Sequence, residues 1–168
     1  MIAEKIRQTA LAYVGKTETA GNSGFADPAF QKEMQRVGWQ KGMAWCSFFA
    51  ELAYAEAYKG DPAKSAAVTK LFSGSAVQTF TNFKNAGYRT DAVPNVGDLA
   101  VWRYGNGWQG HIGIVVSVDG KGGFQSVEGN TNDAGGREGI MVAVKRRRTG
   151  EPFRAKGLNI VGFISPMS

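Results

Sequence analysis

The first half of the chain repeats its apolar residues at helical spacing. Ile2, Ile6, Ala10 and Tyr13 are three or four positions apart, which is the period of an amphipathic helix. Asp or Ser precedes three of the later predicted helices, and in two cases Pro follows the Asp, which is typical of a helix start. Gly follows the end of most of the predicted helices. The predicted helices run from Ile2 to the turn at Gly15, from Asp27 to Gly38, from Trp45 to Lys59, from Asp61 over a short distance, and from Ser75 to Gly87.

After Gly87 the pattern changes to short apolar and β-branched runs separated by turn residues. Strands are predicted over Leu99–Arg103, His111–Val118, Phe124–Glu128, Ile140–Lys145 and Leu158–Ser165. The Gly-rich segment 119–123 predicts a hairpin between the second and third of these strands, and residues 130–139 form a polar loop. Helices first and strands second indicate an α+β fold, with the helices packed on one side of an antiparallel sheet.

Composition is that of one globular domain. The chain has 168 residues, of which 43% are hydrophobic and 20% charged. No apolar run approaches the roughly 20 residues needed to span a bilayer. The N-terminus carries Glu4, Lys5 and Arg7, so it is typical of an amphipathic helix rather than of a secretory signal. We therefore expect synthesis in the cytoplasm, with release by lysis or by a specialised secretion machine.

The formal net charge is +6, from 20 Lys and Arg against 14 Asp and Glu. An excess of this sign favours an anionic partner, which can be nucleic acid, a membrane surface or an acidic polymer such as the bacterial cell wall. Charge alone does not choose among these.

The chain holds one cysteine, Cys46, and one histidine, His111. A single cysteine excludes an internal disulfide framework and a cysteine-rich zinc site. Cys46 precedes a long apolar-rich run, so it lies in the first turn of a predicted helix, where the helix dipole favours the nucleophilic thiolate. Each residue also has an ordinary interpretation, as a small buried hydrophobe or a structural histidine.

The predicted hairpin brings a possible partner to His111. Glu128 ends the strand that follows the His111 strand, and Asn130 lies two residues further on. Since residues i and i+2 of a strand share a face, both side chains are expected near His111. Either one can orient a catalytic histidine and stabilise its cation, and we favour Glu128 because it is charged.

Four segments together resemble the CHAP domain, the cysteine, histidine-dependent amidohydrolase/peptidase group of the papain-like and NlpC-type superfamily. They are Trp45-Cys46-Ser47, Val96-Gly97-Asp98-Leu99-Ala100-Val101-Trp102, Gly110-His111-Ile112-Gly113-Ile114-Val115 and Val127-Glu128-Gly129-Asn130. The resemblance covers roughly residues 38–165. It implies a papain-like fold and a single catalytic domain over residues 1–168, with no separate wall-binding domain.

The resemblance also implies an activity, cleavage of an amide bond in peptidoglycan. Cys46 would attack the carbonyl, His111 would transfer the proton, and Glu128 or Asn130 would orient His111. The Cys46 backbone N–H would belong to the oxyanion hole, and Gln40 is a further oxyanion candidate because papain-like proteases often keep a glutamine at this spacing. Trp45, Tyr104 and Trp108 are candidates for the substrate groove.

The remaining expectations concern partners. We expect no metal and no cofactor, since acidic residues near Asn22 and Asp27 are too sparse for a calcium site. The basic run Lys145–Arg148 suits nucleic acid or an acidic wall polymer; we expect peptidoglycan as substrate, no nucleic acid, and a monomer. A phage endolysin, a wall-remodelling enzyme or an injected lytic enzyme would fit. The alternatives are an amidase acting on a non-wall amide and a non-catalytic basic binding module.

Overall fold

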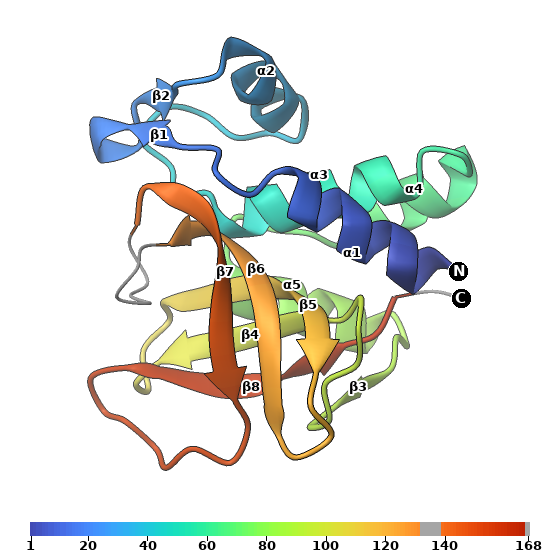
Figure 1. Ribbon diagram of the computed structural model, residues 1–168, viewed down its shortest axis with the longest axis vertical. Helices are drawn as coiled ribbons and strands as arrows, with labels where there is room; N and C mark the ends of the chain where they lie inside the picture. The colour runs from blue at the N-terminus through green and yellow to red at the C-terminus, as the bar shows by residue number, and fades with distance from the viewer. Residues whose placement is uncertain (132–138, 167–168) are drawn as a thin grey trace.

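The computed structural model describes residues 1–131 and 139–166, and within them it confirms the α+β layout (Figure 1). The helices are α1 (Ile2–Ala12), the 3-10 helix η1 (Ala20–Asn22), α2 (Pro28–Arg36), α3 (Cys46–Ala57), α4 (Pro62–Thr69) and α5 (Ala76–Asn85). The strands are β1 (Glu18–Thr19), β2 (Gly24–Phe25), β3 (Thr90–Asp91), β4 (Leu99–Tyr104), β5 (Gly110–Val118), β6 (Gly123–Thr131), β7 (Met141–Arg148) and β8 (Leu158–Ile164).

Three of the helices begin at the capping residues that the sequence indicates. The side chain of Asp27 accepts hydrogen bonds from two backbone N–H groups of α2, Asp61 accepts one from α4, and Ser75 accepts one from α5. These bonds satisfy donors that have no partner inside a helix. The short signals in the sequence therefore fix where α2, α4 and α5 start.

Six strands form one antiparallel sheet in the order β3-β8-β4-β5-β6-β7. The sheet is strongly coiled, so that β8 crosses the direction of β7 (Figure 1). The segment 16–26, which lies between the first two predicted helices, contains the small antiparallel pair β1–β2. Most of the polar loop predicted over residues 130–139 lies outside the described residues.

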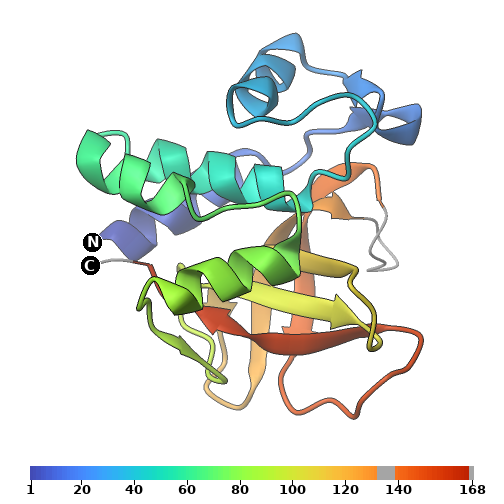
Figure 2. The ribbon, with the colours of Figure 1, turned by 180° about the vertical axis from the view of Figure 1, so that it is seen from behind.

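The two faces of the sheet carry different cores. The larger core joins α1, α3 and α5 to one face, and α1 and α3 lie side by side in both views (Figures 1 and 2). The other face carries a smaller cluster, formed by Ala100, Trp102, Val115, Phe124 and Phe163. Among the described residues, no helix has the length and apolarity that crossing a membrane requires.

Candidate active site

The first turn of α3 is held against the sheet by a side chain from β6. Trp45 is the N-cap residue of α3, and its own side chain makes no capping hydrogen bond. Instead, the Oδ1 atom of Asn130 accepts a hydrogen bond from the Trp45 backbone N–H at 2.7 Å, and its Nδ2 atom donates to the Gly139 carbonyl at 2.8 Å. Asn130 therefore fixes the helix start at the point where Cys46 begins the helix.

Close contact between α3 and β6 depends on Gly129. A Cβ atom at this position would lie 2.7 Å from the Cβ atom of Phe49 and 2.8 Å from Cζ3 of Trp45. Real side chains do not approach this closely, so only glycine lets the helix start reach the strand. This packing sets the position of Cys46 beside the start of β5 and the end of β6.

His111 lies beneath this helix start and is fully buried. Its ring centroid is 5.8 Å from that of Trp102, its register partner on β4. The Nε2 atom of His111 lies 2.7 Å from Oε2 of Glu128. Because an ionised carboxylate only accepts hydrogen bonds, Nε2 is the donor in this pair.

The other ring nitrogen of His111 is left for the cysteine. Within the described residues Nδ1 has no hydrogen bond of regular geometry, although it is buried. Burial lowers the pKa of His111, but the negative charge of Glu128 and hydrogen bonding with Cys46 and Glu128 outweigh burial and raise that pKa to about 9. At neutral pH the imidazole next to Cys46 is therefore held in its protonated form.

Glu128 is anchored by two further side chains. Ser126 Oγ donates to Oε1 at 2.6 Å, and Arg147 donates from Nε to Oε1 at 2.8 Å and from Nη2 to Oε2 at 2.6 Å. Burial raises the pKa of Glu128, but the hydrogen bonds and charges of Arg147 and His111 lower it to about 2. Gly113 makes room for this carboxylate, since a Cβ atom there would lie 2.6 Å from Cγ of Glu128. The carboxylate of Glu128 therefore stays ionised and is held in one orientation.

The cysteine opens into a small cleft of about 140 Å³. Cys46 is only 7% exposed, whereas Trp108 at the rim is 78% exposed. Backbone N–H groups of the first helical turn lack partners inside the helix and carry its positive end. The cleft can therefore hold a carbonyl group near both the thiol and these donors. Its lining residues are Ala44, Cys46, Gly74, Ser75, Ala76, Trp108, Gln109 and Gly110.

The structure separates Glu128 from Asn130, which the sequence places on one face. The register of β6 shifts between Glu128 and Thr131, and Asn130 has a left-handed backbone with φ of 54°. Asn130 thus turns toward Trp45 while Glu128 turns toward His111. The irregularity breaks the two-residue alternation on which the sequence argument relied.

The structure also shows where the four remaining candidates lie. Trp45 is fully buried against Phe25, and its Nε1 donates to Glu18, so the interpretation of Trp45 as a groove residue is wrong. Gln40 is exposed at a turn closed by the Met43 N–H and does not line the described cleft. Trp108 lines the cleft, and Tyr104 lines a separate groove on the sheet.

Sequence reasoning missed the residues that hold Glu128. The sequence suggests Lys145–Arg148 as one basic surface cluster, but side chains alternate along the strand. Arg147 turns inward, 5.0 Å from the Trp102 ring centroid, and Lys145 is buried. Counting alternate residues back from Glu128 also leads to Ser126 on the same face. The two-residue period was therefore a usable signal for both residues.

Comparison with protein families gives a match to the CHAP domain over residues 38–130, more than half of the chain. The chain belongs to the CHAP domain family. The matched CHAP segment contains Cys46, His111 and Glu128, whereas Arg147 lies beyond it. Comparison with curated proteins and with solved structures gives no significant match.

Membership in the CHAP family is consistent with a hydrolase of amide bonds, either an amidase or a peptidase. Over residues 1–131 and 139–166, no three His, Cys, Asp or Glu side chains are grouped in a way that could hold a metal ion.

Proposed function

We propose that this CHAP domain hydrolyses an amide bond of bacterial peptidoglycan, with Cys46 as nucleophile. The observation that carries the proposal is the buried pairing of His111 with Glu128 next to a thiol at a helix start. A purely structural histidine has no need of a bidentate arginine behind its carboxylate partner. A non-catalytic binding module would not need this arrangement either.

In the first step the Cys46 thiolate attacks the amide carbonyl carbon, and the carbonyl oxygen takes up the negative charge. The Cys46 backbone N–H and the positive end of α3 stabilise that oxygen. Protonated His111 then gives its Nδ1 proton to the amide nitrogen, the C–N bond breaks and the amine leaves. A thioester between Cys46 and the acyl part of the substrate remains.

In the second step neutral His111 takes a proton from a water molecule as that water attacks the thioester carbonyl. The C–S bond breaks, the carboxylic acid is released, and Cys46 and His111 return to the thiolate and imidazolium forms. Glu128 stays ionised throughout and keeps the Nδ1 atom of His111 directed at the sulfur. Its role is that of the third member of a catalytic triad.

Three features support peptidoglycan as the substrate. CHAP domains often act on it, and the net charge of +6 suits an anionic wall polymer. The exposed ring of Trp108 at the cleft rim also offers a flat apolar surface to a sugar or peptide. A lytic role, as in a phage endolysin or an injected enzyme, follows from the same proposal.

Replacement of the nucleophile tests the proposal. Cys46→Ala should abolish lysis of purified walls while the protein remains folded, because the change in volume is small. Cys46→Ser should be nearly inactive as well, since a hydroxyl is far less acidic than a thiol. Lysis is followed by turbidity and folding by circular dichroism. Substantial lysis by folded Cys46→Ala protein would rule out a cysteine hydrolase.

A further inference from the structure

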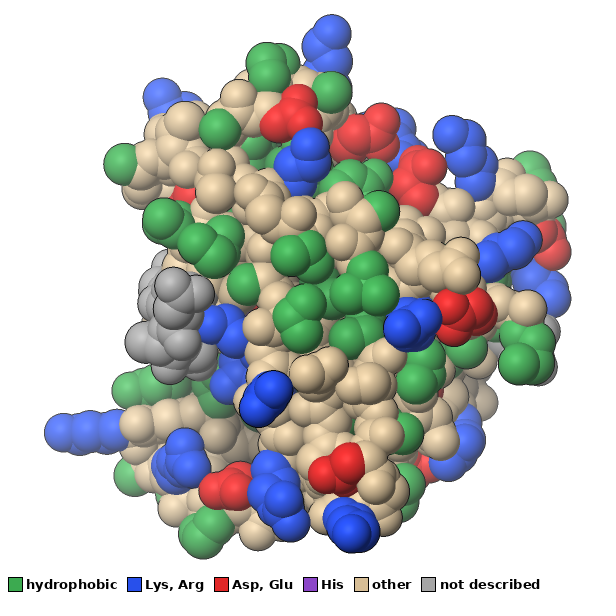
Figure 3. Space-filling model, viewed as in Figure 1, with side chains coloured by type: hydrophobic (Ala, Val, Ile, Leu, Met, Phe, Trp, Pro, Cys, Tyr) green, Lys and Arg blue, Asp and Glu red, His purple; other side chains and the backbone are tan. Residues whose placement is uncertain are grey.

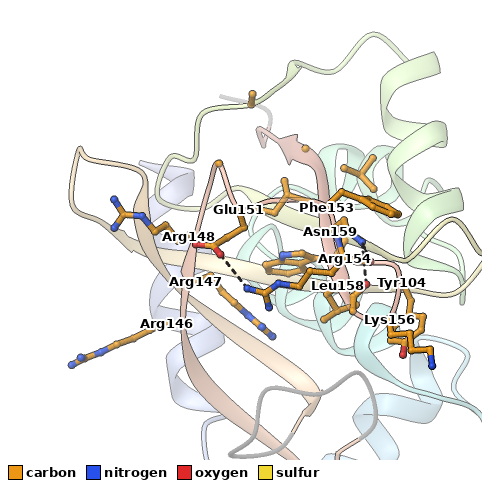
Figure 4. Close-up of a pocket in the computed structure, with 17 residues that line it drawn as sticks. Tyr104, Arg146, Arg147, Arg148, Glu151, Phe153, Arg154, Lys156, Leu158 and Asn159 are labelled. Carbon is orange, nitrogen blue, oxygen red and sulfur yellow. Dashed lines mark hydrogen bonds and ion pairs between the residues drawn. The ribbon is translucent and has the colours of Figure 1, made fainter.

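A second and larger hollow lies on the sheet face that does not carry the helices. It has a volume of about 940 Å³ and is lined by β8, the end of β7 and the loop 149–157 (Figure 4). Its floor includes Trp102 and Ile160 of the smaller apolar cluster. We call this hollow the sheet groove; Cys46 is not among its lining residues.

Aromatic side chains mark the opening of the sheet groove. Phe153 is 59% exposed and Tyr104 is 36% exposed, and both line the groove together with the buried Trp102. Solvent-exposed aromatic rings offer apolar surface on which a ligand with flat apolar faces can stack. Sugar rings have such faces.

The groove is also basic. Five of its lining residues are Arg or Lys, and Glu151 is the acidic one among them. Arg147 is committed to Glu128, and the side chains of Arg146 and Arg148 extend away from the aromatic residues (Figure 4). This leaves Arg154 and Lys156 as the cations of the groove itself.

These two cations are accessible to an incoming anion. Arg154 pairs with Glu151 at 3.1 Å, and both side chains are exposed. Exposed pairs of this kind contribute little to stability, so a ligand carboxylate can replace Glu151 as the partner of Arg154. The charges therefore complement a ligand that carries carboxylates along its length.

One loop connects the sheet groove with the catalytic cleft. Tyr104 lines the groove, and Trp108 and Gln109 line the cleft, so only the segment 105–107 lies between them along the chain. The Gly105 N–H donates to the Gly157 carbonyl at 2.9 Å, which joins this segment to the loop that carries Arg154 and Lys156. A polymer that occupies the cleft can thus continue over the loop into the groove.

We propose that the sheet groove binds a further stretch of the peptidoglycan substrate, outside the cleft in which the bond is cut. Sugar rings stack on Phe153 and Tyr104, and carboxylates of the peptide stems pair with Arg154 and Lys156. The inference rests on the proposed function, because it takes the polymer in the cleft to be peptidoglycan. It assigns the groove to wall binding and not to catalysis.

Binding to purified wall sacculi tests the assignment, with the Cys46→Ala substitution in every protein so that nothing is cut. Phe153→Ala and the pair Arg154→Gln/Lys156→Gln should each weaken co-sedimentation about tenfold. The matched control is Lys70→Gln/Lys84→Gln, which removes the same charge from α5 and the end of α4 and should bind like the parent. Equal binding by groove variants and parent would overturn the proposal.

Activity measurements separate this proposal from the proposed function. With Cys46 intact, the groove variants should lyse walls more slowly but turn over a small soluble muropeptide at the parent rate. Loss of muropeptide turnover in the groove variants would show that the groove serves catalysis or folding, and would overturn the inference alone. If the parent protein cuts neither substrate, the proposed function itself fails.

Two further binding measurements identify the polymer that the groove binds. Sacculi stripped of phosphodiester polymers should retain binding, because the proposed ligand is the peptidoglycan; loss of binding after stripping would contradict this. Retention on a DNA column is measured for the same variants. If the groove substitutions abolish DNA retention and leave wall binding unchanged, the groove is a nucleic-acid site and the proposal is wrong.

Discussion

The buried carboxylate of Glu128 receives hydrogen bonds from three side chains, those of His111, Ser126 and Arg147. A buried charge is costly unless it is paired and hydrogen-bonded. Here the pairing keeps Glu128 ionised and raises the pKa of His111 to about 9. The charge state of the His111–Glu128 pair therefore depends on Arg147 as well as on the two residues themselves.

Glu128→Gln should change the pH dependence of the reaction. The leaving amine needs protonated His111, so kcat/KM on a soluble muropeptide should fall as pH rises through about 9. Removing the negative charge removes the main cause that raises the pKa of His111, and burial then lowers it. The alkaline limb should move to lower pH, with roughly a 100-fold loss of activity near neutrality. Rates measured from pH 5 to 10 give both values.

Asn130→Gly is the matched comparison, because glycine accepts the left-handed backbone at this position and removes only the side-chain bonds. This variant should lose activity and thermal stability, because the start of α3 is no longer held against β6. The alkaline limb of its pH–rate profile should stay where it is in the parent. If Asn130→Gly shifts the limb and Glu128→Gln does not, Asn130 is the orienting residue and our assignment is reversed.

At the scale of elements, local signals in the sequence account for the helices and the long strands. Asp27 and Ser75 place their helices because a cap is a short-range interaction. β1, β2 and β3 have two residues each, too few to show an alternation. The irregularity after Glu128 lies where β6 contacts the start of α3, a contact between residues far apart in the sequence. The two-residue alternation therefore predicted the contact between His111 and Glu128 and misplaced the side chain of Asn130.

Packing of α3 on β6 predicts a large effect at one glycine. Gly129→Ala would put a methyl group against Phe49 and Trp45 and push the helix start off the sheet, so Cys46 would move away from His111. We expect a loss of about 1–3 kcal/mol in the free energy of unfolding and a large loss of wall lysis. Urea denaturation and turbidity assays measure the two effects.

Gly60→Ala provides the control for this prediction. Gly60 lies just beyond the other end of α3, and a Cβ atom there would meet nothing within 4 Å. Its stability and activity should stay close to those of the parent. Similar losses of stability and wall lysis in both variants would mean that α3 is generally sensitive to substitution nearby. The close contact of Gly129 with α3 would then have no special importance.

At the scale of the whole molecule, positive charge is spread widely. Figure 3 shows Lys and Arg side chains scattered over the visible face with a few acidic residues between them. The run Lys145–Arg148, which the sequence suggests as one patch, is divided: Lys145 is buried, and Arg147 binds Glu128. Under the proposed function, attraction to an anionic wall would come from the overall charge of +6, to which the exposed Arg146 and Arg148 of β7 contribute.

Salt should therefore inhibit lysis of walls more than turnover of a small muropeptide. Exposed charges are screened over about 8 Å at physiological ionic strength and about 3 Å at 1 M. Arg146→Ser/Arg148→Ser should reproduce part of the salt effect on walls and spare the small substrate; Arg147 is left in place because it anchors Glu128. Equal salt sensitivity of both substrates would show that salt acts on the cleft or on folding.

The most direct test of the central claim, amide hydrolysis by Cys46, is a mass spectrum of the fragments released from purified peptidoglycan. The parent protein should release fragments that differ from the intact structure by one water at a single type of amide bond, with a new amine and a new carboxylic acid. Folded Cys46→Ala protein should release none. Cleavage only at glycosidic bonds, or the same amide fragments from Cys46→Ala, would contradict the account.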